Sequence, residues 1–229
     1  MKDSLIRRIV ASYDHPIVRL YSRTRFIILR ERFLEEIGQY LPTTGRVVDI
    51  GCGFGLFALY FAARSPGIHI HGIDLNSRRI EWARAAAQRL GIENVRFEAC
   101  NARDFQSSDN LHGAYMLDMI HHIPPDGVRP LIEHLTGRLN ANARLVIKDV
   151  DSSPFRKIAF TWLLDKLMDF RAPVCYWPQN QVIELLQSVG LVVHRHALVD
   201  ILPYPHMLYI GQKIVSAATE IPARDDSRF

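Results

Sequence analysis

The stretch Val47–Gly55, which reads Val-Val-Asp-Ile-Gly-Cys-Gly-Phe-Gly, decides the fold of this chain. Three β-branched residues and an aspartate lead into glycines at positions 51, 53 and 55, and the apolar segment 56–63 follows with helical spacing. This order predicts a strand, a tight loop and a helix. Because glycine lacks a Cβ, the loop backbone can bend sharply and approach a ligand closely. We therefore expect a ligand above the carboxyl end of this strand, where open α/β sheets bind.

The spacing of the glycines indicates which kind of ligand suits the loop. A dinucleotide fingerprint reads G-x-G-x-x-G, whereas here the third glycine comes one residue early and Leu56 stands where the fingerprint has glycine. Asp49 puts a negative charge near the loop, which would repel a phosphate and attract an ammonium or sulfonium cation. The pattern therefore favours a cationic ligand over a pyrophosphate.

Val47–Gly55 resembles motif I of the class I methyltransferases, enzymes that use S-adenosylmethionine. The motif is specific when a second strand ending in an acid follows at the right distance, as Gly72-Ile73-Asp74-Leu75 does. The resemblance covers roughly 41–213 and is strongest over 47–150. It implies an α/β fold of three layers, with a Rossmann-like seven-stranded sheet that is mostly parallel and has a reversed last strand, and it implies S-adenosylmethionine as the cofactor.

The resemblance also assigns roles to residues of the loop and of neighbouring strand ends. The three glycines would admit the methionine part, Asp49 would offset its positive charge, and Asp74 would accept hydrogen bonds from both ribose hydroxyls. At the corner that reads adenine in the family, an acid is usual; here Asn101 supplies an amide oxygen instead, and Ala102 a backbone N–H. The full expected cofactor set is Asp49, Gly51, Cys52, Gly53, Gly55, Asp74, Leu75, Asn101, Ala102, Leu117 and Asp118. Two local readings stay open: Asp74 as a helix-capping acid and Asn101 as an ordinary turn residue.

Two adjacent histidines follow the fourth expected strand, in a sequence that resembles the D-x-L-H-H-x-P element of small-molecule methyltransferases. His121 and His122 lie where a methyl acceptor should bind, and a histidine near neutral pH could take a proton from it. Neighbours on an extended segment point opposite ways, so we expect one of them, His122, to face the acceptor. The alternative is that both only tie the loop to nearby backbone.

The remaining periodicity predicts the other elements. Residues 1–41 read as an N-terminal cap of two helices broken near Asp14–Pro16, and 42–213 as the methyltransferase domain. Pro154 and the apolar spacing after it predict an amphipathic helix in an insertion, 152–177, which would form a lid over the acceptor or pack on the cap. The tail 214–229 is patternless, and we expect it to be disordered. The expected strands are 47–50, 68–75, 94–100, 112–120, 143–150, 191–199 and 206–213, and the later helices are 77–90, 126–139 (capped by Asp126) and 179–189.

Charge and composition bound the setting. The 229 residues are 48% hydrophobic, and the net charge is +4. The three cysteines are far apart and show no C-x-x-C spacing, and no apolar run reaches the roughly 18 residues of a membrane span. These features favour a single domain in a reducing cytoplasm, with no metal site. The cap is rich in arginine, which suits an anionic membrane surface or substrate, or simply a solvated face. The charged end of the fifth strand, Lys148–Asp151, could position an acceptor, although a salt-bridged rim is the favoured explanation.

These features predict an enzyme that moves a methyl group from S-adenosylmethionine to a small, apolar, lipid-like or quinone-like acceptor, in the cytoplasm or at the inner face of the membrane. A regulatory domain that binds the cofactor without turnover remains an alternative. A nicotinamide-dependent oxidoreductase is disfavoured by the glycine spacing. A nucleic-acid methyltransferase is disfavoured because His-His-Ile-Pro-Pro stands where N-P-P-Y or D-P-P-Y is usual, so we expect no nucleic-acid partner.

Overall fold

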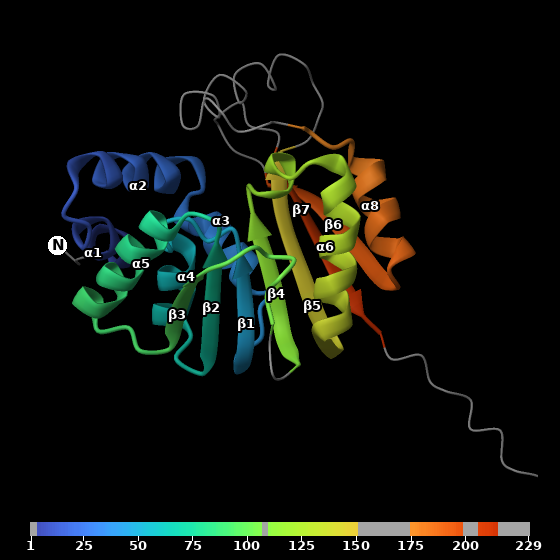
Figure 1. Ribbon diagram of the computed structural model, residues 1–229, viewed down its shortest axis with the longest axis horizontal. Helices are drawn as coiled ribbons and strands as arrows, with labels where there is room; N and C mark the ends of the chain where they lie inside the picture. Colours follow the sequence, from blue (N-terminus) through green and yellow to red (C-terminus); the bar gives the residue numbers. More distant parts are fainter. Residues whose placement is uncertain (1–3, 107–109, 151–174, 199–205, 215–229) are drawn as a thin grey trace, which may run out of the picture.

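One seven-stranded sheet, lying between two layers of helices, forms the centre of the protein in the computed structural model (Figure 1). The structure describes residues 4–106, 110–150, 175–198 and 206–214. The strands run in the order β3-β2-β1-β4-β5-β7-β6. Their bounds are β1 Gly45–Ile50, β2 Ile68–Asp74, β3 Val95–Ala99, β4 Leu111–Leu117, β5 Leu139–Val150, β6 Leu191–Leu198 and β7 His206–Lys213.

The direction of the strands confirms the predicted fold class. Strands β1 to β5 pair in parallel, whereas β7 is antiparallel to both β5 and β6. Parallel strands end at the same edge of a sheet, so the carboxyl ends of β1, β2 and β4 meet there. The described helices are α1 Leu5–Ala11, α2 Pro16–Ile28, α3 Glu31–Gly38, α4 Leu56–Arg64, α5 Ser77–Leu90, α6 Pro125–Arg138 and α8 Gln179–Ser188, with a 3-10 turn, η1, at Ile120–His122.

Alternating side chains on the strands give the sheet two separate cores. Val47 and Tyr115 face the helices α1 to α5, while their chain neighbours Val48 and Met116 face α6 and α8. This is the two-residue period of a strand buried on both faces. Among the helices of the described residues, none is both long enough and apolar enough to cross a bilayer.

The N-terminal cap differs from the prediction of two helices. The break at Asp14–Pro16 is present, but a second break follows α2, where Leu29 leaves helical geometry with φ −102° and ψ 82°. The cap therefore contains three helices, and α3 begins at Glu31. Neither proline nor glycine marks this second break, and Leu29 is instead held there by its burial in the core.

Strand and helix ends near the ligand edge also differ. The fourth strand was expected to reach Ile120, but it ends at Leu117 because Asp118 adopts a φ of +55°, which ends the extended backbone. The helix expected to be capped by Asp126 begins one residue earlier, with Pro124 at the cap and Pro125 in the first turn. Of the predicted lid, 152–177, only Cys175–Trp177 belong to the described residues, and of the predicted tail only Ile214 does. The lid, the tail and the domain boundaries therefore stay predictions.

Candidate active site

A cavity of about 560 Å³ opens at the carboxyl ends of the strands. It is lined by the ends of β1, β2 and β4, by η1, and by one face of α2. The expected site residues that line it are Asp49, Gly51, Cys52, Gly53, Asp74, Leu75, Asn101, Ala102, Leu117, Asp118, His121 and His122. Gly55 is the one member of the expected set that does not line it. The sequence-predicted residues are therefore brought together around one space.

The glycine loop has the backbone that only glycine adopts readily. Gly51, Gly53 and Gly55 have φ values of +74°, +55° and +77°. Nothing lies within 4 Å of the position where a Cβ on Gly53 would stand, so this part of the backbone is open to the cavity. A Cβ on Gly55 would instead meet Phe97 at 2.6 Å and Ala83 at 2.9 Å. Gly55 thus permits close packing between α4, α5 and β3, and Gly53 permits close approach of a ligand.

Asp74 supports the glycine loop from the neighbouring strand. The Gly53 backbone N–H donates to its Oδ2 at 2.9 Å, and the Asn76 N–H donates to its Oδ1 at 2.8 Å. The cap of α5 is made separately by the side chain of Asn76, which accepts from the N–H of Arg79 at 3.1 Å. Each carboxylate oxygen can accept more than one hydrogen bond. Asp74 can therefore position the loop and still receive two hydroxyl groups from the cavity.

Asp49 lies at the bottom of the cavity, where its side chain is buried. Burial raises the pKa of Asp49 to about 8, although the neighbouring Tyr115 hydroxyl acts in the opposite direction. Desolvation of a carboxylate has this effect because the charged form loses its hydration. A cation bound beside Asp49 would restore the carboxylate. The residue is thus suited to a positively charged ligand.

The corner expected to read adenine is arranged as a turn. Asn101 uses its side-chain oxygen to accept from the N–H of Arg103 at 3.0 Å, and its own carbonyl accepts from the N–H of Asp104 at 2.9 Å. The turn interpretation of Asn101 therefore holds, and the amide oxygen retains one further acceptor site toward the cavity. Contact between Asn101 or Ala102 and an adenine stays a prediction.

An ionic cluster that the sequence did not reveal lies on the other side of the cavity. Arg25 of α2 is 2.7 Å from Asp118, and the Lys148 ammonium of β5 also contacts the Asp118 carboxylate. The salt bridges predicted at this strand end are present, but they do not lie at an exposed rim, because Lys148 is fully buried and Asp149 is nearly so. Burial alone would raise the pKa of Asp118, but Lys148 and Arg25 hold it well below its usual range. Burial, with help from Lys148, lowers the pKa of the nearby His206 to about 3, so His206 is neutral at physiological pH.

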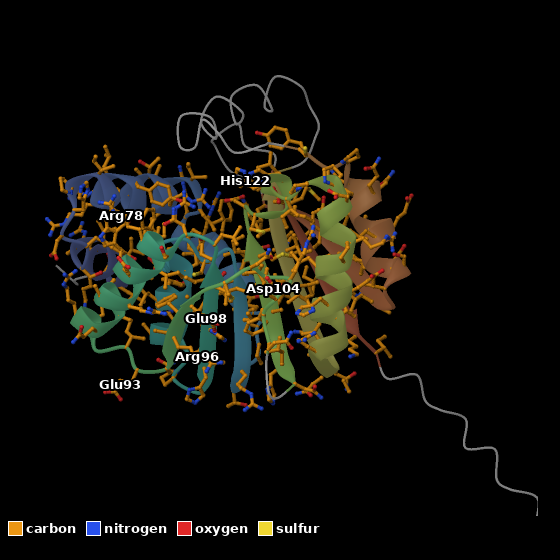
Figure 2. The ribbon with its side chains drawn as sticks, viewed as in Figure 1. Arg78, Glu93, Arg96, Glu98, Asp104 and His122 are labelled. Carbon is orange, nitrogen blue, oxygen red and sulfur yellow. The ribbon has the colours of Figure 1, made fainter. Side chains whose placement is uncertain are left out.

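The two histidines occupy different environments on the 3-10 turn. The His121 Nδ1 is 2.5 Å from an oxygen of Asp149, its backbone N–H donates to the other oxygen at 3.2 Å, and its side chain is 2% exposed. His122 is half-buried and lies above the end of β4 (Figure 2). The two rings are only 4.1 Å apart between centroids, so the expectation that they point opposite ways is wrong. In a 3-10 turn, unlike in a strand, the side chains of neighbouring residues do not point to opposite sides. His121 is thus an anchor of the turn, and His122 is the more accessible ring.

The N-terminal cap packs directly on the glycine loop. The Tyr13 hydroxyl donates to the carbonyl of Phe54 at 2.7 Å. The centroid of the Phe54 ring is 4.9 Å from that of Tyr21 and 5.5 Å from that of Trp82. Together with Arg25 and Tyr21 in the cavity wall, these contacts make the cap a part of the site. The arginine pattern marked the cap as basic but gave no signal that one arginine faces inward.

The chain is similar in sequence to a methyltransferase family model and to several named enzymes. The family model described as "Methyltransferase domain" matches residues 47–142. The O-methyltransferase rstn1 of Aspergillus nomiae is 30% identical over 127 residues, which are 54% of this chain and 55% of that protein. The S-adenosyl-L-methionine-dependent Diels-Alderase iccD of Talaromyces variabilis is 33% identical over 89 residues, or 36% of this chain and 29% of that protein. Further relatives are named ribosomal RNA methyltransferases. The chain spans about half or less of the length of these relatives.

The fold also matches solved structures. An O-methyltransferase family protein from Burkholderia thailandensis superposes with a TM-score of 0.68 at 17% identity, and the match covers 93% of this chain and 64% of that one. At this identity the likeness concerns the fold alone. Residues 47–142 therefore match a methyltransferase domain, and the strand order with its reversed β7 and the open glycine loop over Asp49 and Asp74 agree with the class I S-adenosylmethionine-dependent methyltransferase fold.

Proposed function

We propose that this protein is an enzyme that transfers the methyl group of S-adenosylmethionine to a small apolar acceptor. One observation carries the proposal: the glycine loop, with Asp49 and Asp74, shares a single cavity with His122. The groups expected to bind the donor and to accept a proton thus line one cavity. When bound, S-adenosylmethionine supplies a methyl group on a cationic sulfonium and is therefore already activated for displacement.

The residues of the chain would bind and align the reactants. Asp49 would face the positive charge of the donor, the open backbone at Gly53 would admit its methionine part, and Asp74 would accept from its ribose. Asn101, Ala102 and Leu75, which also line the cavity, would contact its adenine. Alignment of this kind provides much of the rate of a displacement reaction, because it replaces a bimolecular encounter by a bound pair.

His122 would take the proton from the acceptor. It is half-buried in the cavity wall, whereas His121 is held by Asp149 and fixes the turn that carries His122. Apolar residues continue the wall beyond the histidines, which supports an acceptor with an apolar body; they are Ile28, Met119, Ile123, Pro124, Leu131 and Val150. The O-methyltransferase rstn1 supports an oxygen atom as the methylated position.

The finer part of the proposal concerns the class of acceptor and where in the cell the protein acts. We infer a lipid-like or quinone-like acceptor and contact with an anionic membrane, supported by six arginines against one acid between Ser4 and Arg30. The three cysteines, all among the described residues, carry free thiols, which supports a reducing cytoplasm. Among the described residues, no cluster of three or more histidine, cysteine, aspartate or glutamate side chains is arranged to hold a metal ion.

A second function has a specific observation in its favour. The relative iccD is named a Diels-Alderase that depends on S-adenosylmethionine, so a chain of this family could bind the cofactor and act without methyl transfer. The rRNA methyltransferase names of other relatives make nucleic acid a third acceptor class to test. This chain shows the histidine pair in place of the motif usual for methylation of base amines.

An acceptor screen with donor labelled at the methyl group tests these functions together. The expected result is label in a phenol, quinol or similar apolar acceptor, with equimolar S-adenosylhomocysteine. Conversion of a substrate without S-adenosylhomocysteine would favour the second function, and label in ribosomal RNA would favour the third. Two variants test the role of His122. His122→Ala removes the base together with the ring and its hydrogen bonds, whereas His122→Gln removes the base and the ring but keeps a side chain that can form hydrogen bonds.

A further inference from the structure

Helix α2 has four distinct faces, and one of them is exposed and apolar. At 100° per residue, Val18, Ser22 and Phe26 fall on the buried face, and Tyr21, Arg25 and Ile28 fall on the face that lines the cavity. The exposed apolar face carries Ile17, Leu20 and Ile27, which are 70%, 65% and 60% exposed. Leu20 and Ile27 lie beside the cavity-lining face, and Ile17 lies in line with that face in the first turn of the helix.

The fourth face of α2 is basic. Arg19 and Arg23 lie between the buried face and the apolar face, and both are exposed. Arg23 stands between Leu20 and Ile27 on the helix surface, since it is three residues after the first and four before the second. The chain has no acid from His15 to Arg30 but four arginines, of which Arg19 and Arg23 belong to this face, while Arg25 pairs with Asp118 in the cavity wall. A helix with cations beside an apolar face has the pattern of elements that lie in the interface of an anionic bilayer.

The position of α2 agrees with such a contact. It lies outermost at the end of the molecule where the strands reach their carboxyl ends, at the upper left in Figure 1. Isolated exposed apolar residues are common on protein surfaces, but three large ones on one helix face, next to a ligand cavity and flanked by arginines, form a patch of the kind that marks a binding surface. The positive charge of this face favours an anionic membrane as the partner, because a partner protein or a second copy of the chain would not by itself require these cations.

We propose that the face of α2 formed by Ile17, Leu20, Arg23 and Ile27 docks on a membrane that contains anionic lipid. The contact would place the cavity wall formed by Tyr21, Thr24, Arg25 and Ile28 next to the lipid surface. An apolar acceptor dissolved in the bilayer could then reach the cavity along α2 without crossing water. This inference rests on the proposed function for the acceptor, and it specifies the surface of the membrane contact proposed there; the docking itself does not require methyl transfer.

Flotation with vesicles tests the proposal on the full chain. The wild-type protein is expected to float with vesicles of equal parts phosphatidylglycerol and phosphatidylcholine, to stay in solution with phosphatidylcholine alone, and to be released as salt rises. Replacing Ile17, Leu20 and Ile27 together by serine should reduce the bound fraction at least about tenfold, since the apolar contact is lost. Arg23→Gln should weaken binding about fivefold, the contribution of one cation near an anionic surface.

Matched variants on other surfaces serve as controls. Val192→Ser and Ile214→Ser remove apolar side chains that are 44% and 53% exposed, and Arg129→Gln removes a cation on α6 that is 55% exposed. None of these should change flotation. Calorimetric titration of the serine triple variant with S-adenosylhomocysteine should give wild-type affinity, because its three positions do not line the cavity.

The outcomes distinguish this inference from the proposed function. If the wild-type protein does not float with anionic vesicles, or if the triple variant floats as well as the wild type, the docking surface is wrong even when methyl transfer occurs. If the triple variant abolishes self-association and vesicle binding is absent, the face binds a second copy instead. If flotation behaves as expected but no acceptor is methylated, the docking inference holds and the proposed function fails.

Discussion

The guanidinium of Arg25, on helix α2, lies 2.7 Å from the carboxylate of Asp118, at the end of strand β4. This contact joins the N-terminal cap to the central sheet at the cavity wall. Asp118 also contacts the buried Lys148, and its backbone has a φ of +55°, an uncommon conformation for a residue with a side chain. The end of β4 is therefore held by partners on two other elements.

Removing Arg25 tests this connection. In Arg25→Met, the Asp118 carboxylate loses one of two cations, and the free energy of unfolding should fall by about 1 to 3 kcal/mol, less than for a completely buried pair because Arg25 is partly exposed. Urea unfolding provides the measurement. The control is Arg64→Met, whose pair with Glu35 is about half exposed and should contribute less than about 1 kcal/mol. Equal losses in both variants would mean that the Arg25 contact has no special role.

Asp74 should matter for the donor in two ways. Asp74→Ala removes the acceptor of the Gly53 N–H and the expected acceptor of the ribose hydroxyls, so binding of S-adenosylhomocysteine should weaken by about 2 to 3 kcal/mol. Calorimetric titration measures it. Glu93→Ala, at an exposed position far from the cavity (Figure 2), is the control and should leave the affinity unchanged. A change below about 0.5 kcal/mol in Asp74→Ala would show that the ribose is held elsewhere.

Asp49 should make donor binding depend on pH. With a pKa of about 8 in the empty site, it carries a proton at neutral pH and must release it to face a cation. The affinity for S-adenosylmethionine should therefore rise between about pH 6 and 9, and this rise should be absent in Asp49→Asn. The difference between wild type and variant is the quantity to compare, because the α-amino group of the ligand titrates in the same range. Parallel pH profiles would contradict the assignment.

The same group affects folding in the opposite direction. The folded pKa of Asp49 is raised above its unfolded value, near 3.8, so the native state binds more protons than the unfolded state between about pH 4 and 8. The contribution of Asp49 to the free energy of unfolding should then fall as pH rises through this window. In urea unfolding of the ligand-free protein, the free energy of unfolding of the wild type minus that of Asp49→Asn should fall as pH rises from about 4 to 8. A difference that rises over this range would overturn this sign.

The histidines should separate into a base and an anchor. His122→Ala should lower turnover by about 10² to 10⁴ with little change in donor affinity, and the loss should shrink for acceptors that are already ionised. His121→Ala should instead lower stability, because the buried Asp149 carboxylate loses the imidazole and keeps the backbone N–H groups of residues 121 and 150 as donors. Thermal unfolding and steady-state kinetics on both variants distinguish the two roles. Full turnover in His122→Ala would reduce this residue to part of the cavity wall.

The sequence identified the residues whose chemistry is local. Glycines 51, 53 and 55 and the acid that ends β2 form a pattern within one strand-loop-helix unit and its neighbour, and short-range patterns of this kind predict both the sheet and the cofactor edge. Gly55 was assigned to the ligand because it belongs to that pattern. Its actual neighbour, Phe97, comes from β3, and no local signal reveals such a contact.

The ionic cluster could not be read from the sequence for the same reason. Lys148 follows three buried apolar residues of β5, and a charged residue at a strand end usually reaches solvent. Its burial depends on Asp118 from β4 and on the approach of α2, which are set by tertiary packing. The histidine turn was mispredicted because the positive φ of Asp118 ends the strand early. A positive φ at a residue other than glycine cannot be predicted from the residue type.

Quantifying S-adenosylhomocysteine against methylated acceptor, in one reaction with purified protein, tests the central claim most directly. Mass spectrometry should find the two products in equal amounts, with the acceptor heavier by one methylene unit, and both should fall together in His122→Ala. Substrate conversion without S-adenosylhomocysteine, or tight donor binding with no methylated product across the acceptor screen, would contradict the assignment as a methyltransferase.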